Sequence, residues 1–205
     1  MAEARILITA PNLILVEGKD EVLILGALVR AEGIQGVQVI SFEGKQRLPG
    51  FLKSLVRTHN VLSVRSIGVV RDADANPEGA LKSVRDALSR VGLPTPQAPL
   101  SPASGPPRVT LMILPGASRP GALEDLCLEA VAGDPAFPCL AKYFDCLKEV
   151  GMEGPRNLSR ARMQVFLASR SEAGKRLGEA AQAGYLPWDA PAFAELRTFL
   201  QTVSR

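Results

Sequence analysis

Two aspartates that stand one residue apart, Asp72 and Asp74, have the types and spacing that point most directly to chemistry. They follow the apolar run SIGVV at residues 66–70. Alternate residues of an extended segment point the same way, so both carboxylates can face one cation. Hard carboxylate oxygens are the ligands that Mg²⁺ and Mn²⁺ prefer. The pair therefore either holds a cation or lies on a solvated loop.

Further acidic residues follow two other apolar runs, at residues 12–16 and 109–114. In a parallel α/β sheet the carboxyl ends of the strands meet at one edge, where such folds bind ligands. Carboxylates that converge there repel each other unless they are protonated or bridged by a cation. The sequence therefore favours a metal site over solvated loop acids. The acids concerned are Glu17, Asp20 and Glu21 after the first run, and Glu124 and Asp125 after the second.

The elements that must position these acids alternate along the first half of the chain. Strand-like apolar runs alternate with segments of helical periodicity, which predicts an α/β fold with a largely parallel sheet flanked by helices. The expected strands are residues 12–16, 37–42, 66–70 and 109–114, and the expected helices are residues 19–32, 48–58 and 77–91. Residues 94–107 contain six prolines in fourteen positions, which predicts a surface loop.

The second half of the chain has a helical pattern from residue 122 onward. We therefore expect an α/β domain over residues 1–130 and a helical C-terminal extension over residues 131–205 that packs on it. The expected helices are residues 123–131, 138–150, 158–168, 173–183 and 192–203.

The composition of the chain limits the kinds of binding partner and the cellular compartment to be expected. The net charge of +3 arises within residues 151–205, which fits a phosphate-bearing partner weakly and a solvated helix surface equally well. Aromatic residues make up 5% of the chain, so base stacking on an aromatic platform is not expected to dominate. Three cysteines without a CxxC pair argue against a disulfide framework or a structural zinc site and indicate a reducing cytoplasm. No apolar run approaches membrane-spanning length.

Two segments around the acids resemble motifs of the Toprim family, the topoisomerase–primase fold. VEGKDE at residues 16–21 is similar to the first Toprim motif, and VRDAD at residues 70–74 is similar to its DxD motif. Glu21, and a later acid in GALEDL at residues 121–126, resemble the Toprim domains of OLD-type (overcoming lysogenization defect) nucleases. The chain as a whole resembles stand-alone Toprim-like proteins of undefined function.

This resemblance implies a Toprim-like fold and Mg²⁺- or Mn²⁺-dependent phosphodiester chemistry on DNA or RNA. By resemblance, Glu17 matches a glutamate proposed as general acid/base or metal ligand, and Asp72 and Asp74 match magnesium ligands. Glu21 and Glu124 match acids that help hold a second metal in the OLD type. The phosphate needs positive charge beyond the metals, and Lys19, Arg71 and Arg119, which stand beside the acids, are the candidates to supply it. For each of the three, the sequence favours a surface charge or an ion-pair partner over a phosphate contact.

The chain also departs from the OLD type. It has no GxxxxGK[ST] motif, so an ATPase would have to be a separate partner. Arg160 and Arg162 lie where OLD-type sites are thought to use a lysine. Arginine can neutralise the charge of a phosphate, so both are candidate phosphate contacts, but arginine does not readily donate its proton. The sequence therefore leaves two readings open: a nuclease-like enzyme, or a non-catalytic Toprim-like module that binds nucleic acid, nucleotide or a protein partner. A purely structural α/β protein with incidental acids is a third, and no oligomeric state follows.

Overall fold

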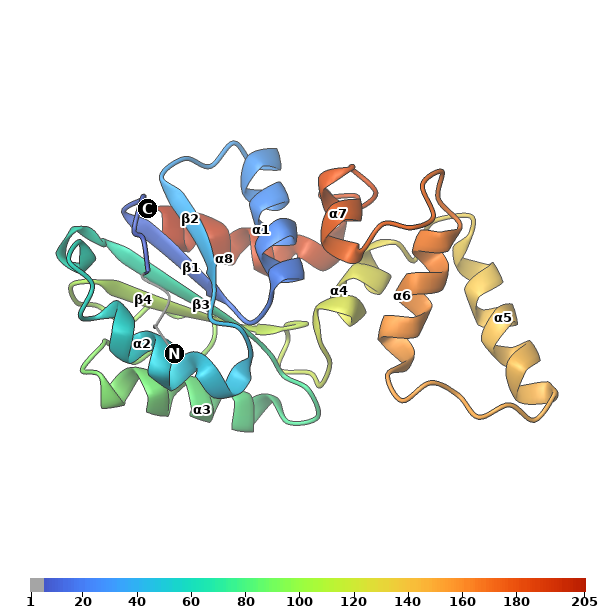
Figure 1. Ribbon diagram of the computed structural model, residues 1–205, viewed down its shortest axis with the longest axis horizontal. Helices are drawn as coiled ribbons and strands as arrows, with labels where there is room; N and C mark the ends of the chain where they lie inside the picture. The colour runs from blue at the N-terminus through green and yellow to red at the C-terminus, as the bar shows by residue number, and fades with distance from the viewer. Residues whose placement is uncertain (1–5) are drawn as a thin grey trace.

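The computed structural model describes residues 6–205, and its centre is a parallel sheet (Figure 1). Within these residues the sheet has four strands in the order β2-β1-β3-β4, and every neighbouring pair is parallel. The strands are β1 (Asn12–Val16), β2 (Val37–Ser41), β3 (Ser66–Asp72) and β4 (Arg108–Leu114). The predicted α/β fold with a parallel sheet and flanking helices is therefore confirmed.

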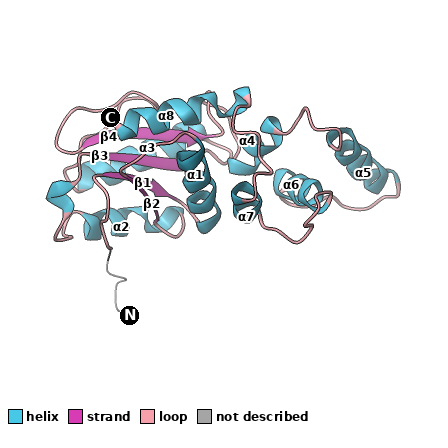
Figure 2. Cartoon of the chain, turned by 90° about the horizontal axis from the view of Figure 1, so that it is seen from above, coloured by secondary structure: helices cyan, strands magenta, loops and turns pink. Residues whose placement is uncertain are grey.

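The side chains of β1 alternate between two cores, as the period of two in a strand requires. Leu13 and Leu15 are fully buried against one layer of helices, and Ile14 and Val16 are fully buried against the other. One face of the sheet is covered by α2 (Leu48–Leu55) and α3 (Pro77–Arg90), and the other by α1 (Lys19–Ala31) and α8 (Ala194–Ser204) (Figures 1 and 2). Because both faces are covered, the strands read as continuous apolar runs in the sequence.

The last helix, α8, lies very close to the sheet at Gly68 in β3. A Cβ at this position would stand 2.5 Å from Phe199 Cζ and 2.7 Å from Val203 Cγ2. Only a glycine leaves room for such an approach. The C-terminal segment therefore supplies part of the main core.

The strand register brings the predicted acids to one edge. Leu15 of β1 pairs with Val69 of β3, and Asp72 of β3 pairs with Leu114 of β4, all in parallel, so β1, β3 and β4 end at the same side of the sheet. Strand β3 continues two residues beyond the apolar run at residues 66–70, which makes Asp72 its last residue. Helix α3 begins after Asn76, whose side chain accepts a hydrogen bond from the Gly79 backbone N–H at 2.8 Å.

Four helices lie beyond the carboxyl edge of the sheet (Figure 1). They are α4 (Leu123–Ala130), α5 (Phe137–Glu149), α6 (Leu158–Ala168) and α7 (Leu177–Gln182). Helix α7 packs on α1, α4 packs on α6, and α5 contacts α6 and buries Leu140. The helix expected at residues 173–183 begins only at Leu177, so residues 171–176 form a loop.

The remaining segments are short helical turns and loops. The turns are η1 (Lys45–Arg47), η2 (Val61–Ser63) and η3 (Pro191–Phe193). Residues 94–107 contain no helix or strand and touch the sheet through an isolated bridge between Ala103 and Val109, as the proline density predicts. Between residues 6 and 205 every helix is too short or too polar to cross a bilayer. The division into residues 1–130 and 131–205 stays a prediction.

Candidate functional site

Glu17 leaves the end of β1 and is held in place by two donors. Its Oε2 accepts a hydrogen bond from Arg71 Nε at 3.2 Å, and its Oε1 accepts one from the Lys45 backbone N–H at 3.2 Å. The Glu17 side chain is 23% exposed, and that of Arg71 is 7% exposed. A partly buried ion pair of this kind fixes the carboxylate, because removing either partner leaves an uncompensated charge.

Asp72 stands at the centre of the strand ends. Its Oδ1 accepts a hydrogen bond from the Leu123 backbone N–H at 3.1 Å, which ties the end of β3 to the start of α4. Burial, and after it the negative charges of Glu21, Glu17 and Glu124, together raise the pKa of Asp72 to about 8. The hydrogen bond from Leu123 opposes this shift. Asp72 therefore lies within a group of mutually repelling acids.

Glu21, in the first turn of α1, belongs to the same group. Burial raises its pKa, and the charges of Glu17, Asp20 and Glu124 act in the same direction, against the effect of its own backbone N–H. Its carboxylate folds back toward the turn before α1, since a Cβ on Gly18 would lie 2.8 Å from Glu21 Oε2. The four carboxylates that influence one another here, called the acid cluster below, are Glu17, Glu21, Asp72 and Glu124.

Asp74 is turned differently from Asp72. The chain bends there with φ at 52°, and the backbones of Asp74 and Gly121 exchange two hydrogen bonds of 2.8 and 2.7 Å. The Asp74 carboxylate, 51% exposed, lies 2.9 Å from Lys45 Nζ and 3.8 Å from an Arg71 guanidinium nitrogen. The structure therefore pairs Asp74 with two cations at the rim of the cluster, while Asp72 faces the other acids.

Asp125, next to Glu124, has a local structural role. Its Oδ2 accepts a hydrogen bond from the Ala122 backbone N–H at 2.8 Å, and its Oδ1 accepts one from the Ser159 hydroxyl. This arrangement closes the N-terminal turn of α4 and links it to α6. Asp125 thus positions Glu124 through the backbone.

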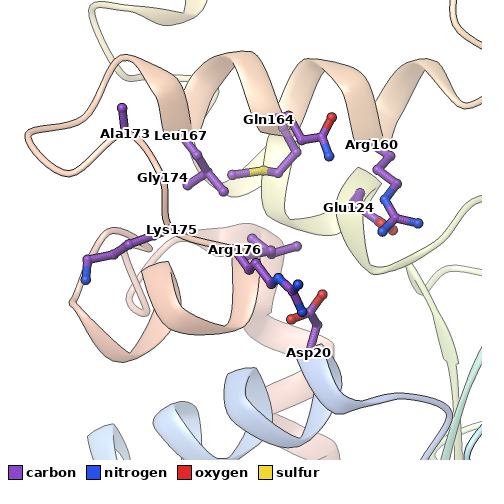
Figure 3. A pocket seen from close by; sticks show the side chains of 11 residues that line it. Asp20, Glu124, Arg160, Gln164, Leu167, Ala173, Gly174, Lys175 and Arg176 are labelled. Carbon is purple, nitrogen blue, oxygen red and sulfur yellow. The ribbon is translucent and has the colours of Figure 1, made fainter.

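The predicted phosphate-binding cations divide into two groups. Arg71 lies inside the cluster, and Arg160 on α6 lies beside Glu124 (Figure 3). Arg119 is half-exposed and pairs instead with Glu129 at 2.9 Å, which raises the pKa of its guanidinium. The Arg162 guanidinium lies over the Phe144 ring of α5, at 5.9 Å from the centroid. Lys19 is exposed at the start of α1.

Two cations at the site were missed by the sequence reasoning. Lys45 follows β2, and the rule that strand ends meet at one edge would have found it, had it been applied to positive residues as well as acids. Arg176 lies beside Asp20 (Figure 3), in a loop that the helical periodicity concealed. No local signal in the sequence marks it.

A cavity of about 470 Å³ adjoins the acid cluster between α6 and α7 (Figure 3). It shares Glu124 with the cluster and includes Asp20, whose charge acts on Glu21. Its lining comes from α1, α4, α6, α7 and the loop before α7, and consists of Asp20, Glu124, Arg160, Met163, Gln164, Leu167, Ala173, Gly174, Lys175, Arg176 and Leu177.

The donor chemistry of the acid cluster fits Mg²⁺ or Mn²⁺, which prefer oxygen ligands. In the side-chain arrangement of residues 6–205, no group of three or more His, Cys, Asp or Glu is placed to hold a metal ion. Mg²⁺ is usually bound through one or two carboxylates, with waters and substrate phosphates completing its shell. The one or two carboxylates that would hold it are drawn from Glu17, Glu21, Asp72 and Glu124, whose mutual repulsion a bound cation would relieve.

Comparisons with known proteins agree with this fold. The C-terminal region of the OLD protein of Xanthomonas campestris pv. campestris is similar over 95% of this chain and 92% of that chain, at 17% identity and a TM-score of 0.53. The C-terminal region of the Burkholderia pseudomallei OLD protein is similar over 96% of this chain and 98% of that chain, at 16% identity and a TM-score of 0.52. The predicted Toprim-like, OLD-related fold is thus confirmed.

Sequence comparison gives the family. No curated protein matches the chain. The family described as "Protein of unknown function (DUF3226)" matches residues 11–205. The chain therefore belongs to the DUF3226 family and has the fold of the C-terminal region of OLD proteins.

Proposed function

We propose that this protein cleaves phosphodiester bonds in DNA or RNA with Mg²⁺ or Mn²⁺ held at the acid cluster. The observation that carries the proposal is the convergence of Glu17, Glu21, Asp72 and Glu124 beyond the strand ends, where burial and the neighbouring carboxylates together raise the pKa of Asp72 to about 8. A divalent cation bridging these carboxylates would remove that repulsion. The fold shared with the C-terminal region of OLD proteins supports the same assignment.

The residues of the site have separate roles in this reaction. When bound, a metal ion would activate the attacking water and stabilise the leaving oxygen. Glu17, oriented by Arg71 and by the Lys45 backbone N–H, takes a proton from the attacking water. Arg71 and Lys45, which both lie near Asp74 Oδ2, offset negative charge that develops on the phosphate.

The first test compares Asp72→Asn with Asp86→Asn. Asp86 is an acid on the exposed face of α3 that pairs with Lys82, so it controls for loss of one negative charge. Isothermal titration should show that Mn²⁺ binds to wild type and to Asp86→Asn, and that its affinity for Asp72→Asn is at least tenfold lower. Cleavage of labelled single-stranded and duplex DNA and of RNA, with Mn²⁺, should fall at least 100-fold in Asp72→Asn only.

Two results would overturn the proposal. One is cleavage that survives unchanged in Asp72→Asn, since the activity would then come from elsewhere. The other is equal Mn²⁺ binding by the two variants, since the acid cluster would then not hold the ion. Circular dichroism and urea unfolding of both variants establish that each is folded under the assay conditions.

A second function, a non-catalytic module that binds nucleic acid, nucleotide or a protein partner such as a separate ATPase, has one observation in its favour. Lys45 and Arg71 already pair with Asp74 and Glu17, so part of the negative charge at the site is neutralised without a metal ion. Under this reading wild type binds nucleic acid with Mn²⁺ present and cleaves none of it. The cleavage assay above separates the two functions.

A further inference from the structure

The cavity between α6 and α7 combines two kinds of surface. Its floor is apolar and consists of Met163, Leu167 and Leu177, all of them buried. Its rim carries the positive side chains of Arg160, Lys175 and Arg176, together with the amide of Gln164. A volume of about 470 Å³ lies in the range of small-molecule sites, which are largely apolar with a few placed polar groups.

Close packing of α7 on α1 fixes the position of the cavity relative to the acid cluster. A Cβ on Gly178 would lie 2.8 Å from Leu23 Cβ and 3.0 Å from Asp20 Oδ1. This approach keeps Arg176, two residues before Gly178, next to Asp20 (Figure 3). Movement of α7 relative to the sheet edge is therefore restricted at this contact.

The charges at the rim are arranged toward the acid cluster. Arg160 lies beside Glu124 and Arg176 beside Asp20, at the end of the cavity where these acids stand (Figure 3). Lys175 lies at the other end of the view and pairs with Glu172 at 3.0 Å. A phosphate placed between the two arginines would thus stand next to the carboxylates that we assign to the metal ion.

From this arrangement, and resting on the function proposed above, we propose that the cavity binds the nucleotide that adjoins the cleaved phosphodiester. Arg160 and Arg176 bind its phosphate, the apolar floor receives the sugar and one face of the base, and Gln164 meets the polar edge of the base. A guanidinium suits phosphate because its planar set of donors matches two phosphate oxygens. The ligand class is a nucleoside monophosphate unit of DNA or RNA.

The test uses nucleoside monophosphates in EDTA, so it requires neither a metal ion nor cleavage. Amide NMR spectra of the ¹⁵N-labelled full chain are followed during titration with adenosine and thymidine 5′-monophosphates, and separately with adenosine and inorganic phosphate. We expect at least one monophosphate to shift the Gly174 amide and the Gln164 side-chain amide. We also expect it to bind at least fivefold more tightly than either adenosine or phosphate alone.

Two glycine substitutions provide a matched pair. Neither Gly174 nor Gly154 has a neighbouring heavy atom within 4 Å of an added Cβ, but only Gly174 lines the cavity. Gly174→Leu should weaken binding of the monophosphate at least tenfold, while Gly154→Leu should leave it unchanged. Arg160→Gln with Arg176→Gln should reduce the affinity for the monophosphate to that for adenosine.

The proposal is overturned if neither monophosphate shifts the cavity amides, or if Gly174→Leu binds as wild type does. Failure of the proposed function gives a different pattern: the cavity binds nucleotide, but Mn²⁺ neither binds nor supports cleavage. If cleavage depends on Asp72 and Gly174→Leu cleaves as wild type does, the function stands and the cavity assignment falls.

Discussion

The acid cluster and the cavity beside it differ in how far their charged side chains are buried and paired. At the sheet edge, Glu17 and Arg71 are largely buried and pair with each other, and the Lys45 backbone N–H holds Glu17 in addition. Around the cavity, Arg160 and Arg176 are exposed and lie on a helix and a loop. Buried, paired charges are costly to disturb, whereas exposed charges are cheap to lose. We therefore expect removal of a charge to lower stability more at the sheet edge than around the cavity.

Replacing Arg71 by alanine should give the largest loss of stability. The substitution leaves Glu17 without its ion pair next to three other carboxylates, so we expect the free energy of unfolding to fall by about 3 kcal/mol. Urea unfolding at neutral pH measures this loss, and Arg160→Ala serves as the comparison, with an expected change of about 0.5 kcal/mol or less. Equal losses of stability in the two variants would contradict the difference expected between the sheet edge and the cavity.

Asp72→Asn should stabilise the metal-free protein at alkaline pH. The pKa of Asp72 is about 8 in the folded chain against an ordinary value of 3.8, so between these values the folded chain keeps a proton that the unfolded chain has released. Stability therefore falls as the pH rises from about 4 to about 8. Asparagine keeps an oxygen for the Leu123 N–H and cannot ionise, so we expect a gain of about 2 kcal/mol at pH 8.5.

This pH dependence is measured by urea unfolding in EDTA at pH 5 and pH 8.5. The difference in stability between the two pH values should be smaller in Asp72→Asn than in wild type. Asp86→Asn should retain the wild-type difference, because Lys82 lowers the pKa of Asp86 and the acid lies outside the cluster. A difference that is the same in wild type and Asp72→Asn would contradict the burial of Asp72 among like charges.

Arg119→Ala should have the smallest effect. Arg119 is a candidate phosphate contact that the sequence favours as a surface charge or an ion-pair partner, and its guanidinium pairs with Glu129 on an exposed surface. We therefore expect a change in stability of about 0.5 kcal/mol or less, and no change in Mn²⁺ or nucleotide binding. Loss of cleavage in this variant, with Mn²⁺ binding intact, would show that the surface around Arg119 takes part in substrate binding.

The strand ends could be predicted from the sequence because they depend on local pattern. The apolar run at residues 12–16 and the bounds of helix α6 match the structure, and the parallel topology followed from the alternation of elements. The rule that alternate residues face the same way did not extend to Asp74, since β3 ends at Asp72 and the backbone turns left-handed at Asp74. The direction of the acidic side chains could therefore be predicted as far as Asp72, the last residue of β3, but not beyond it.

The cavity between α6 and α7 could be predicted less well from the sequence. Residues 173–183 have helical composition, yet α7 begins at Leu177, and the preceding loop supplies Lys175 and Arg176 to the cavity. Similarly, Arg160 and Arg162 are two residues apart on α6 and point to different sides, one to Glu124 and one to Phe144. Such outcomes depend on tertiary packing between segments, which local periodicity does not specify.

The contact between α8 and Gly68 has a consequence for how the chain folds during synthesis. Strands β1, β3 and β4 leave the ribosome well before residues 194–204, yet the face of the sheet around Gly68 is covered by Phe199 and Val203. Until that segment emerges, the nascent sheet presents an apolar face to solvent, and such faces favour aggregation. Assembly of the acid cluster is therefore coupled to synthesis of residues 194–204.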